Sequence, residues 1–208
     1  MLDLFMSAFV TLFVVIDPPG CAPIYAGLSA GASRAQAISM AARACLIAAG
    51  ILVVFALFGE KLLGFLHIEL NAFRMAGGIM LFIIALEMVF EKRTQRREER
   101  AEKLLTEHPE VEDVSVFPMA MPMLAGPGSI ATIMLLTQRA HGAEETAMVL
   151  GAMLLVLLIS FAGLAAAGPL MRILGDKVEA VITRILGVLL AALAAQFVID
   201  GIKAALTS

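Results

Sequence analysis

The sequence predicts an all-α polytopic membrane protein with six transmembrane helices, arranged as two inverted-topology repeats of three in which helices 1 and 4 are broken. Three observations carry this prediction: the composition, six long apolar runs, and two pairs of matching motifs. Of the 208 residues, 61% are hydrophobic and 16% are charged, whereas soluble domains average roughly 45–50% and about 25%. A soluble domain of this size still exposes roughly a quarter of its surface to water, so we expect a lipid bilayer around this chain.

Six runs of the chain are long enough to cross a membrane, because a spanning helix needs about 20 mostly apolar residues. They cover residues 4–33, 35–59, 70–90, 114–138, 146–171 and 180–199. The charges within them are Asp17, Arg43, Arg74, Glu87 and Arg184. A charge in such a run is costly and usually faces the helix bundle, so these five residues are candidates for function.

A polar connector at about residues 91–113 divides one transmembrane domain into repeat 1 (about 1–90) and repeat 2 (about 114–208). We expect the connector to be a solvated loop with some helix, and a regulatory or partner-binding role is the alternative. Lysine and arginine concentrate on its side of the membrane. That side carries Arg34, Lys92, Arg93, Arg96, Arg97, Arg100, Lys103, Arg172 and Lys177, against Lys61, Arg74, Arg139 and Lys203 on the other. The positive-inside rule therefore places the connector in the cytoplasm and both termini outside.

Two pairs of segments resemble each other at nearly the same spacing. IDPPGCA at 16–22 matches LAGPGSI at 124–130, and FRMAGGIMLF at 73–82 matches TRILGVLLAA at 183–192. The second pair aligns Arg74 with Arg184 and Gly77 with Gly187. Each half then holds three spans, and an odd number of crossings inverts the second half relative to the first, as in many secondary transporters.

The first pair of segments predicts broken helices, because an interior proline removes a backbone hydrogen bond and clashes with the preceding turn. Non-helical backbone inside the membrane must face protein or a water-filled cavity. The half-helix that follows a break begins with free N–H groups, which suit an anion such as a carboxylate. Packing kinks without a site are the alternative reading. The candidate solute-binding residues are Asp17, Pro18, Gly20, Cys21, Gly126, Gly128, Ser129 and Thr132.

The segments 73–82, 120–134 (AMPMLAGPGSIATIM) and 178–202 resemble the MarC family of bacterial inner-membrane proteins, and the likeness runs almost end to end. The family looks related to amino-acid exporters of the LysE superfamily, and some similar proteins are regarded as neutral amino-acid transporters. The resemblance implies a multi-pass protein of the bacterial inner membrane. One departure is at the first break, where the family usually has Asn-Pro and this chain has Asp17-Pro18.

The charges inside the spans leave several interpretations open. Asp17 and Arg43 lie at similar depths from the cytoplasmic end, so they could form an ion pair, whereas Arg43 could instead reach the headgroups. Asp17 would serve as a gate or structural tie if paired, or would carry a coupling proton otherwise. Glu87 is close to the connector, so it either reaches the interface or relays a proton. Arg74 and Arg184 are either interface anchors or gating residues.

The sequence disfavours other classes of function. A net charge of −3 provides no basic field for nucleic acid. Cys21 and Cys45 have no metal-ligand spacing, so we expect neither metal nor cofactor. The histidines His67, His108 and His141 lie outside the spans, which argues against an intramembrane enzyme.

The favoured function is a secondary transporter of a small solute by alternating access, with a neutral amino acid as the expected substrate and proton coupling as one option. A non-transporting structural or regulatory membrane protein is the alternative, and a channel is the third. The residues decide neither the direction of transport nor the oligomeric state.

Overall fold

A computed structural model describes residues 2–90 and 113–207, and the secondary-structure elements in these parts are all helices. The helices are α1 (Leu2–Ile16), α2 (Pro18–Leu28), α3 (Arg34–Phe65), α4 (Leu70–Val89), η1 (Ser115–Leu124), α6 (Pro127–Arg139), α7 (Gly142–Ala165) and α8 (Ala167–Thr207). Five stretches are long and apolar enough to cross a membrane, and the bent pair of η1 and α6 makes a sixth. The prediction of an all-α polytopic membrane protein is confirmed.

The first predicted break is a single residue, Asp17, which joins α1 to α2. Its backbone has φ 59° and ψ 65°, a left-handed conformation that Asp and Asn tolerate better than other side-chain-bearing residues. Pro18 follows at the first helical position, where a missing N–H costs nothing. The motif Asp-Pro-Pro therefore ends one helix and starts the next without a loop.

The second break is more elaborate, because η1 is itself irregular. Phe117 and Met121 leave the helical region, at φ −129°, ψ 128° and φ −129°, ψ 123°. Each precedes a proline, and the proline ring pushes the residue before it into an extended conformation. The axis then bends by 53° between η1 and α6. Gly126 lies at this bend, where a Cβ would approach the carbonyl oxygen of Pro122 to 2.3 Å.

The helix α8 differs from the sequence prediction. Residues 172–179 were expected to connect two spans, but α8 runs without interruption from Ala167 to Thr207. The charged residues of this segment mark where the chain leaves the apolar region, but they do not end the helix, because most of them are good helix formers. Pro169 lies in the first turn of α8, where a proline does not interrupt a helix.

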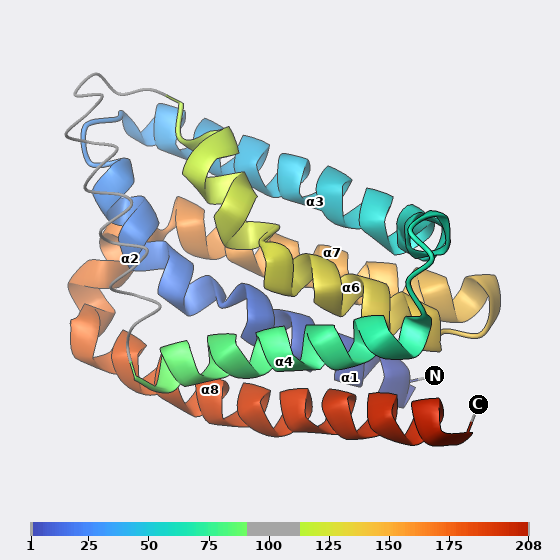
Figure 1. Ribbon diagram of the computed structural model, residues 1–208. Helices are drawn as coiled ribbons and strands as arrows, with labels where there is room; N and C mark the ends of the chain where they lie inside the picture. The colour runs from blue at the N-terminus through green and yellow to red at the C-terminus, as the bar shows by residue number, and fades with distance from the viewer. Residues whose placement is uncertain (1, 91–112, 208) are drawn as a thin grey trace.

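The bundle has two distinct ends (Figure 1). The start of α1 and the end of α8 lie at one end, called the termini end, whereas the end of α4 and the start of η1 lie at the other, called the connector end. The most extensive helix pair is α4 with α8, where backbones approach closely at glycines. A Cβ on Gly78 would lie 3.0 Å from the Ala194 carbonyl oxygen, and one on Gly187 would lie 3.1 Å from that of Ala85. Small residues at these positions let the two helices pack backbone to backbone.

In the remaining helix contacts, each broken span packs against a helix from the other half of the chain. The first broken span, α1 and α2, packs against α7, while the second, η1 and α6, packs against α3. Gly77 faces Ala131 and Leu135 of α6, so it does not have the same neighbours as Gly187, with which the predicted repeat aligns it. Arg74 lies near the termini end of α4, and Arg184 lies near the connector end of the spanning part of α8.

Candidate functional site

Asp17 lies at the first break and caps the start of α2 with its own side chain. Its carboxylate accepts a hydrogen bond from the Gly20 N–H at 3.2 Å, and its backbone carbonyl accepts one from Cys21 N–H at 3.1 Å. Pro18 and Pro19 have no N–H to donate, and a Cβ on Gly20 would lie 2.2 Å from Asp17 Oδ2. The side chain of Asp17 is 1% exposed. The first turn of α2 is therefore satisfied by its own carboxylate and offers no donor to a solute anion.

The start of α6 is different. Gly126 is its N-cap residue, no side chain caps the helix, and Pro127 occupies the first position. Gly128 and Ser129 follow, and both are buried. Thr132, one turn on, is completely buried, and its hydroxyl has no hydrogen-bond partner among the described residues. The start of α6 therefore has a buried hydroxyl beside it and, among the described residues, no carboxylate that caps it as Asp17 caps α2.

The structure brings the two breaks together. A Cβ on Gly128 would lie 3.4 Å from Val15 Cγ1, two residues before Asp17, and 2.6 Å from Ile84 Cδ1 of α4. Cys21 also packs near the junction, where its Sγ donates to the Ile16 carbonyl at 3.6 Å. The atoms nearest to a Cβ on Gly128 are all hydrocarbon, from Ile84, Val15 and Leu81. The two breaks therefore meet through apolar side chains.

Arg43 does not form the ion pair with Asp17 that similar depth suggested. Its guanidinium pairs with Asp113, which also accepts a hydrogen bond from the Ser115 N–H at 3.0 Å. Burial raises the pKa of Asp113, but the hydrogen bond from the Ser115 N–H and the charge of Arg43 lower it by more, so the net shift is downward. The helix α3 has 32 residues, or about 48 Å at 1.5 Å per residue. The helix is therefore longer than the roughly 30 Å hydrocarbon core of a bilayer, so at least one of its ends extends past that core.

The other three charged candidates lie outside the junction of the breaks. Arg74 is partly buried on α4, and its Nε has no hydrogen-bond partner among residues 2–90 and 113–207. Arg184 is exposed on α8. Glu87 is partly buried, about one turn beyond Ile84 toward the connector end. Of these, Glu87 is the closest along its helix to the contact with Gly128.

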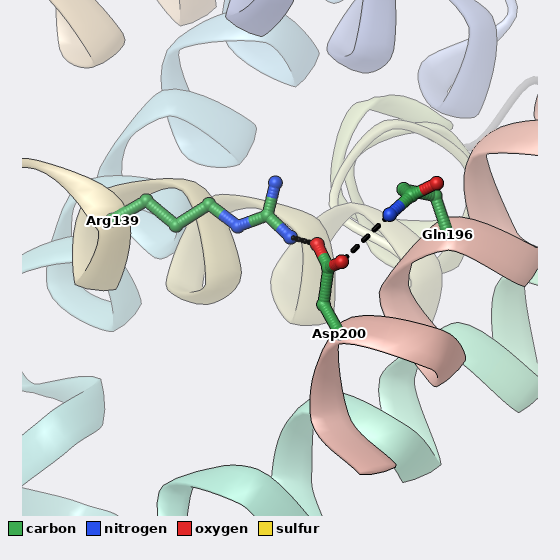
Figure 2. A network of polar contacts seen from close by, with 3 residues as sticks. All are labelled: Arg139, Gln196 and Asp200. Carbon is green, nitrogen blue, oxygen red and sulfur yellow. Dashed lines mark hydrogen bonds and ion pairs between the residues drawn. The ribbon is translucent and has the colours of Figure 1, made fainter. Parts of the chain in front are cut away.

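A polar network at the termini end was missed from the sequence (Figure 2). Arg139 Nη2, at the end of α6, lies 2.5 Å from Asp200 Oδ2 of α8. The Gln196 amide donates to the other carboxylate oxygen at 2.6 Å, and the Arg139 guanidinium carbon lies 4.7 Å from the centroid of the Phe197 ring. The spacing of Gln196 and Asp200, one helical turn apart, is the only sequence signal for this network.

The larger of the two cavities lies between α3, α6 and the start of α7, near the termini end, and has a volume of about 560 Å³. Its polar lining residues are Glu60, Thr137, Gln138 and Thr146. The second cavity is an apolar groove between α3 and α7 that includes Cys45. The sequence analysis did not anticipate the first cavity, because its polar residues come from three different spans.

Comparison with known proteins assigns the family. Residues 2–206 match the model of the MarC family of integral membrane proteins. A UPF0056 membrane protein of Methanocaldococcus jannaschii is 34% identical over 205 residues, covering 99% of this chain and 98% of its own length. The UPF0056 inner membrane protein YhgN of Escherichia coli K12 is 30% identical over 202 residues, covering 95% of each chain. No solved structure matches. The chain therefore belongs to the MarC family of integral membrane proteins.

Proposed function

We propose that this protein is a secondary transporter of a small solute bearing a carboxylate, with a neutral amino acid as the expected substrate. It works by alternating access at the junction of the two broken spans. The observation that carries this proposal is the difference between the two half-helix starts. The start of α2 contains the Asp17 carboxylate. Within residues 2–90 and 113–207, no side chain caps the start of α6, and the buried Thr132 hydroxyl beside it has no hydrogen-bond partner.

The solute carboxylate binds at the N-terminus of α6, as the Asp17 carboxylate does at the N-terminus of α2. A helix N-terminus favours a negative group through its free N–H groups and its dipole. The N–H groups of Gly128 and Ser129 and the hydroxyls of Ser129 and Thr132 supply donors there. Asp17, close by through the contact of Val15 with Gly128, holds the solute ammonium group or the coupling proton.

One ion pair lies at each end of the second broken span, η1 and α6. In the proposed cycle this span moves, because partly exposed ion pairs can open and re-form. At the connector end, Asp113 precedes η1 and pairs with Arg43 of α3. At the termini end, Arg139 completes α6 and pairs with Asp200 of α8. In this proposal each pair is a gate, and opening one while the other stays closed exposes the junction to one side of the membrane.

The proposed placement is in the inner membrane, with the connector in the cytoplasm and the termini outside. The asymmetry of lysine and arginine supports it. The exchange of contacts between the halves supports the inverted repeat, because α7 packs on the first broken span as α3 packs on the second. The positions of Arg74 and Arg184 toward opposite ends of the bundle are consistent with the same relation.

Flux through proteoliposomes tests the proposal. Purified protein is reconstituted, and uptake of radiolabelled amino acids is followed with and without a proton gradient. Saturable, gradient-dependent uptake that falls in the Thr132→Val variant supports the transporter. Ohmic current would indicate a channel, and no flux across a broad amino-acid panel would favour a structural or regulatory membrane protein.

A further inference from the structure

The cavity at the termini end has the size and lining of a binding site. Its volume of about 560 Å³ lies within the range of roughly 300–1,000 Å³ typical of small-molecule pockets. The helix α6 reaches it about 16 Å beyond the start of the helix, since Gln138 follows Pro127 by 11 positions at about 1.5 Å each. The cavity is therefore separate from the junction of the breaks.

Gln138 supplies an unused recognition group. The nitrogen and oxygen of its side-chain amide are both buried, and neither has a hydrogen-bond partner among the described residues. Leaving such a group without a partner costs free energy, and Gln138 is one of the residues that line the cavity, so a guest with both a donor and an acceptor would satisfy the amide once the side chain turns into the cavity. Met134, one turn nearer the break, packs against Gly59, where a Cβ would lie 2.7 Å from Met134 Cε. This contact lies between Gln138 and the start of α6 along the helix.

The charges around the cavity select for a cation. Glu60 is the only charged residue that lines it, and Glu144 and Glu145 lie in the adjoining first turn of α7. Lys61 lies 5.8 Å from the ring of Phe58. Arg139 follows Gln138 in sequence, but its guanidinium is held by Asp200 and Phe197 on α8.

We infer that this cavity binds small solutes that combine a primary ammonium group with a carbonyl group. The ammonium lies against the Glu60 carboxylate, and the carbonyl end exchanges hydrogen bonds with the Gln138 amide. The site is distinct from the proposed transport site, and binding to it requires no transport. The ammonium can come from a soluble amine or from the headgroup of phosphatidylethanolamine.

Equilibrium binding of radiolabelled glycinamide tests this inference, with the protein in phosphatidylcholine nanodiscs. We expect saturable binding that unlabelled acetamide, which lacks the ammonium group, does not displace. Glu60→Gln should weaken binding about fivefold, and Gln138→Leu about tenfold. Ala147→Phe, which fills the cavity without altering a polar group, should abolish it. Glu69→Gln, which removes a carboxylate at the same end but outside the lining, should leave it unchanged.

Two further binding measurements identify where glycinamide binds and whether the natural ligand is a lipid headgroup or a soluble amine. Thr132→Val should not alter glycinamide binding, because Thr132 lies at the junction of the breaks. If phosphatidylethanolamine nanodiscs lower the apparent affinity for glycinamide, the headgroup occupies the same site; if they do not, the ligands are soluble amines. Absence of glycinamide binding, or binding that survives both Glu60→Gln and Ala147→Phe, overturns the inference. Neither result bears on transport, which is measured separately by flux.

Discussion

Arg139 and Asp200 join the end of α6 to α8, with 2.5 Å between the guanidinium nitrogen and the carboxylate oxygen. The two residues are 61 positions apart, so the pair fixes tertiary rather than local structure. About one third of each side chain is exposed, at 37% and 28%. The pair is therefore partly hydrated, which makes it weak enough to open during a conformational cycle.

Breaking this pair should loosen α6 at the termini end with only a small loss of stability. Arg139→Gln and Asp200→Asn, alone and together, should give a coupling energy of about 0.5–1 kcal/mol in a double-mutant cycle from thermal unfolding. Lys61→Gln is the matched control, since the Lys61 contact with Phe58 lies within α3. Strict additivity of the two substitutions would show that the pair contributes nothing.

Replacing Asp17 with Asn should retain the fold and alter proton coupling. Asn caps a helix about as well as Asp and also tolerates the left-handed conformation. Asp17→Ala, in contrast, loses the hydrogen bond to Gly20 and should destabilise the protein by about 1–2 kcal/mol. The measurement is uptake against pH for the Asn variant. An unchanged pH profile would remove Asp17 from the coupling mechanism.

Two glycines of α2 should respond oppositely to alanine. At Gly20 a Cβ would collide with the Asp17 carboxylate, whereas at Gly27 nothing lies within 4 Å. Gly20→Ala should therefore lower stability by about 1–2 kcal/mol through loss of the cap, and Gly27→Ala should raise it by about 0.5–1 kcal/mol. Melting temperatures in one detergent compare the two. Equal effects would contradict the capping role of Asp17.

Thr132→Val should stabilise the protein and impair transport at the same time. Valine has the same shape and removes a buried hydroxyl that has no hydrogen-bond partner in the part of the chain that the structure describes, which should add about 1 kcal/mol of stability. Ser160→Ala is the control, because the Ser160 hydroxyl donates to the Val156 carbonyl at 2.9 Å and its loss should destabilise. A Thr132→Val variant that transports normally would show that the hydroxyl does not meet the solute.

The breaks could be predicted from the sequence because proline and glycine act locally. Asp17-Pro18 and Gly126-Pro127 determine the backbone around them whatever packs nearby. The partners of the charged residues could not be predicted in this way. The depth of Arg43 was counted from a presumed helix end, but α3 is longer than the hydrocarbon core of a bilayer, and Arg43 meets Asp113 instead.

Long-range contacts account for the other differences. The charges of residues 172–179 suggested a loop, although a polar helix that leaves the bilayer has the same composition. The lining of the termini-end cavity combines Glu60, Gln138 and Thr146 from three helices. Each residue alone is an ordinary polar side chain near a helix end, and only the packing of α3, α6 and α7 brings them to one cavity.

The accessibility of Cys21 tests the central claim most directly. Its side chain is completely buried, one turn after Asp17 at the junction of the breaks. In a Cys45→Ala background, a membrane-impermeant thiol reagent is applied to vesicles of each orientation. The account predicts that Cys21 reacts from both faces, and more slowly when a transported solute is present. Cys21 that stays unreactive from both faces during uptake would contradict a solute pathway through the junction.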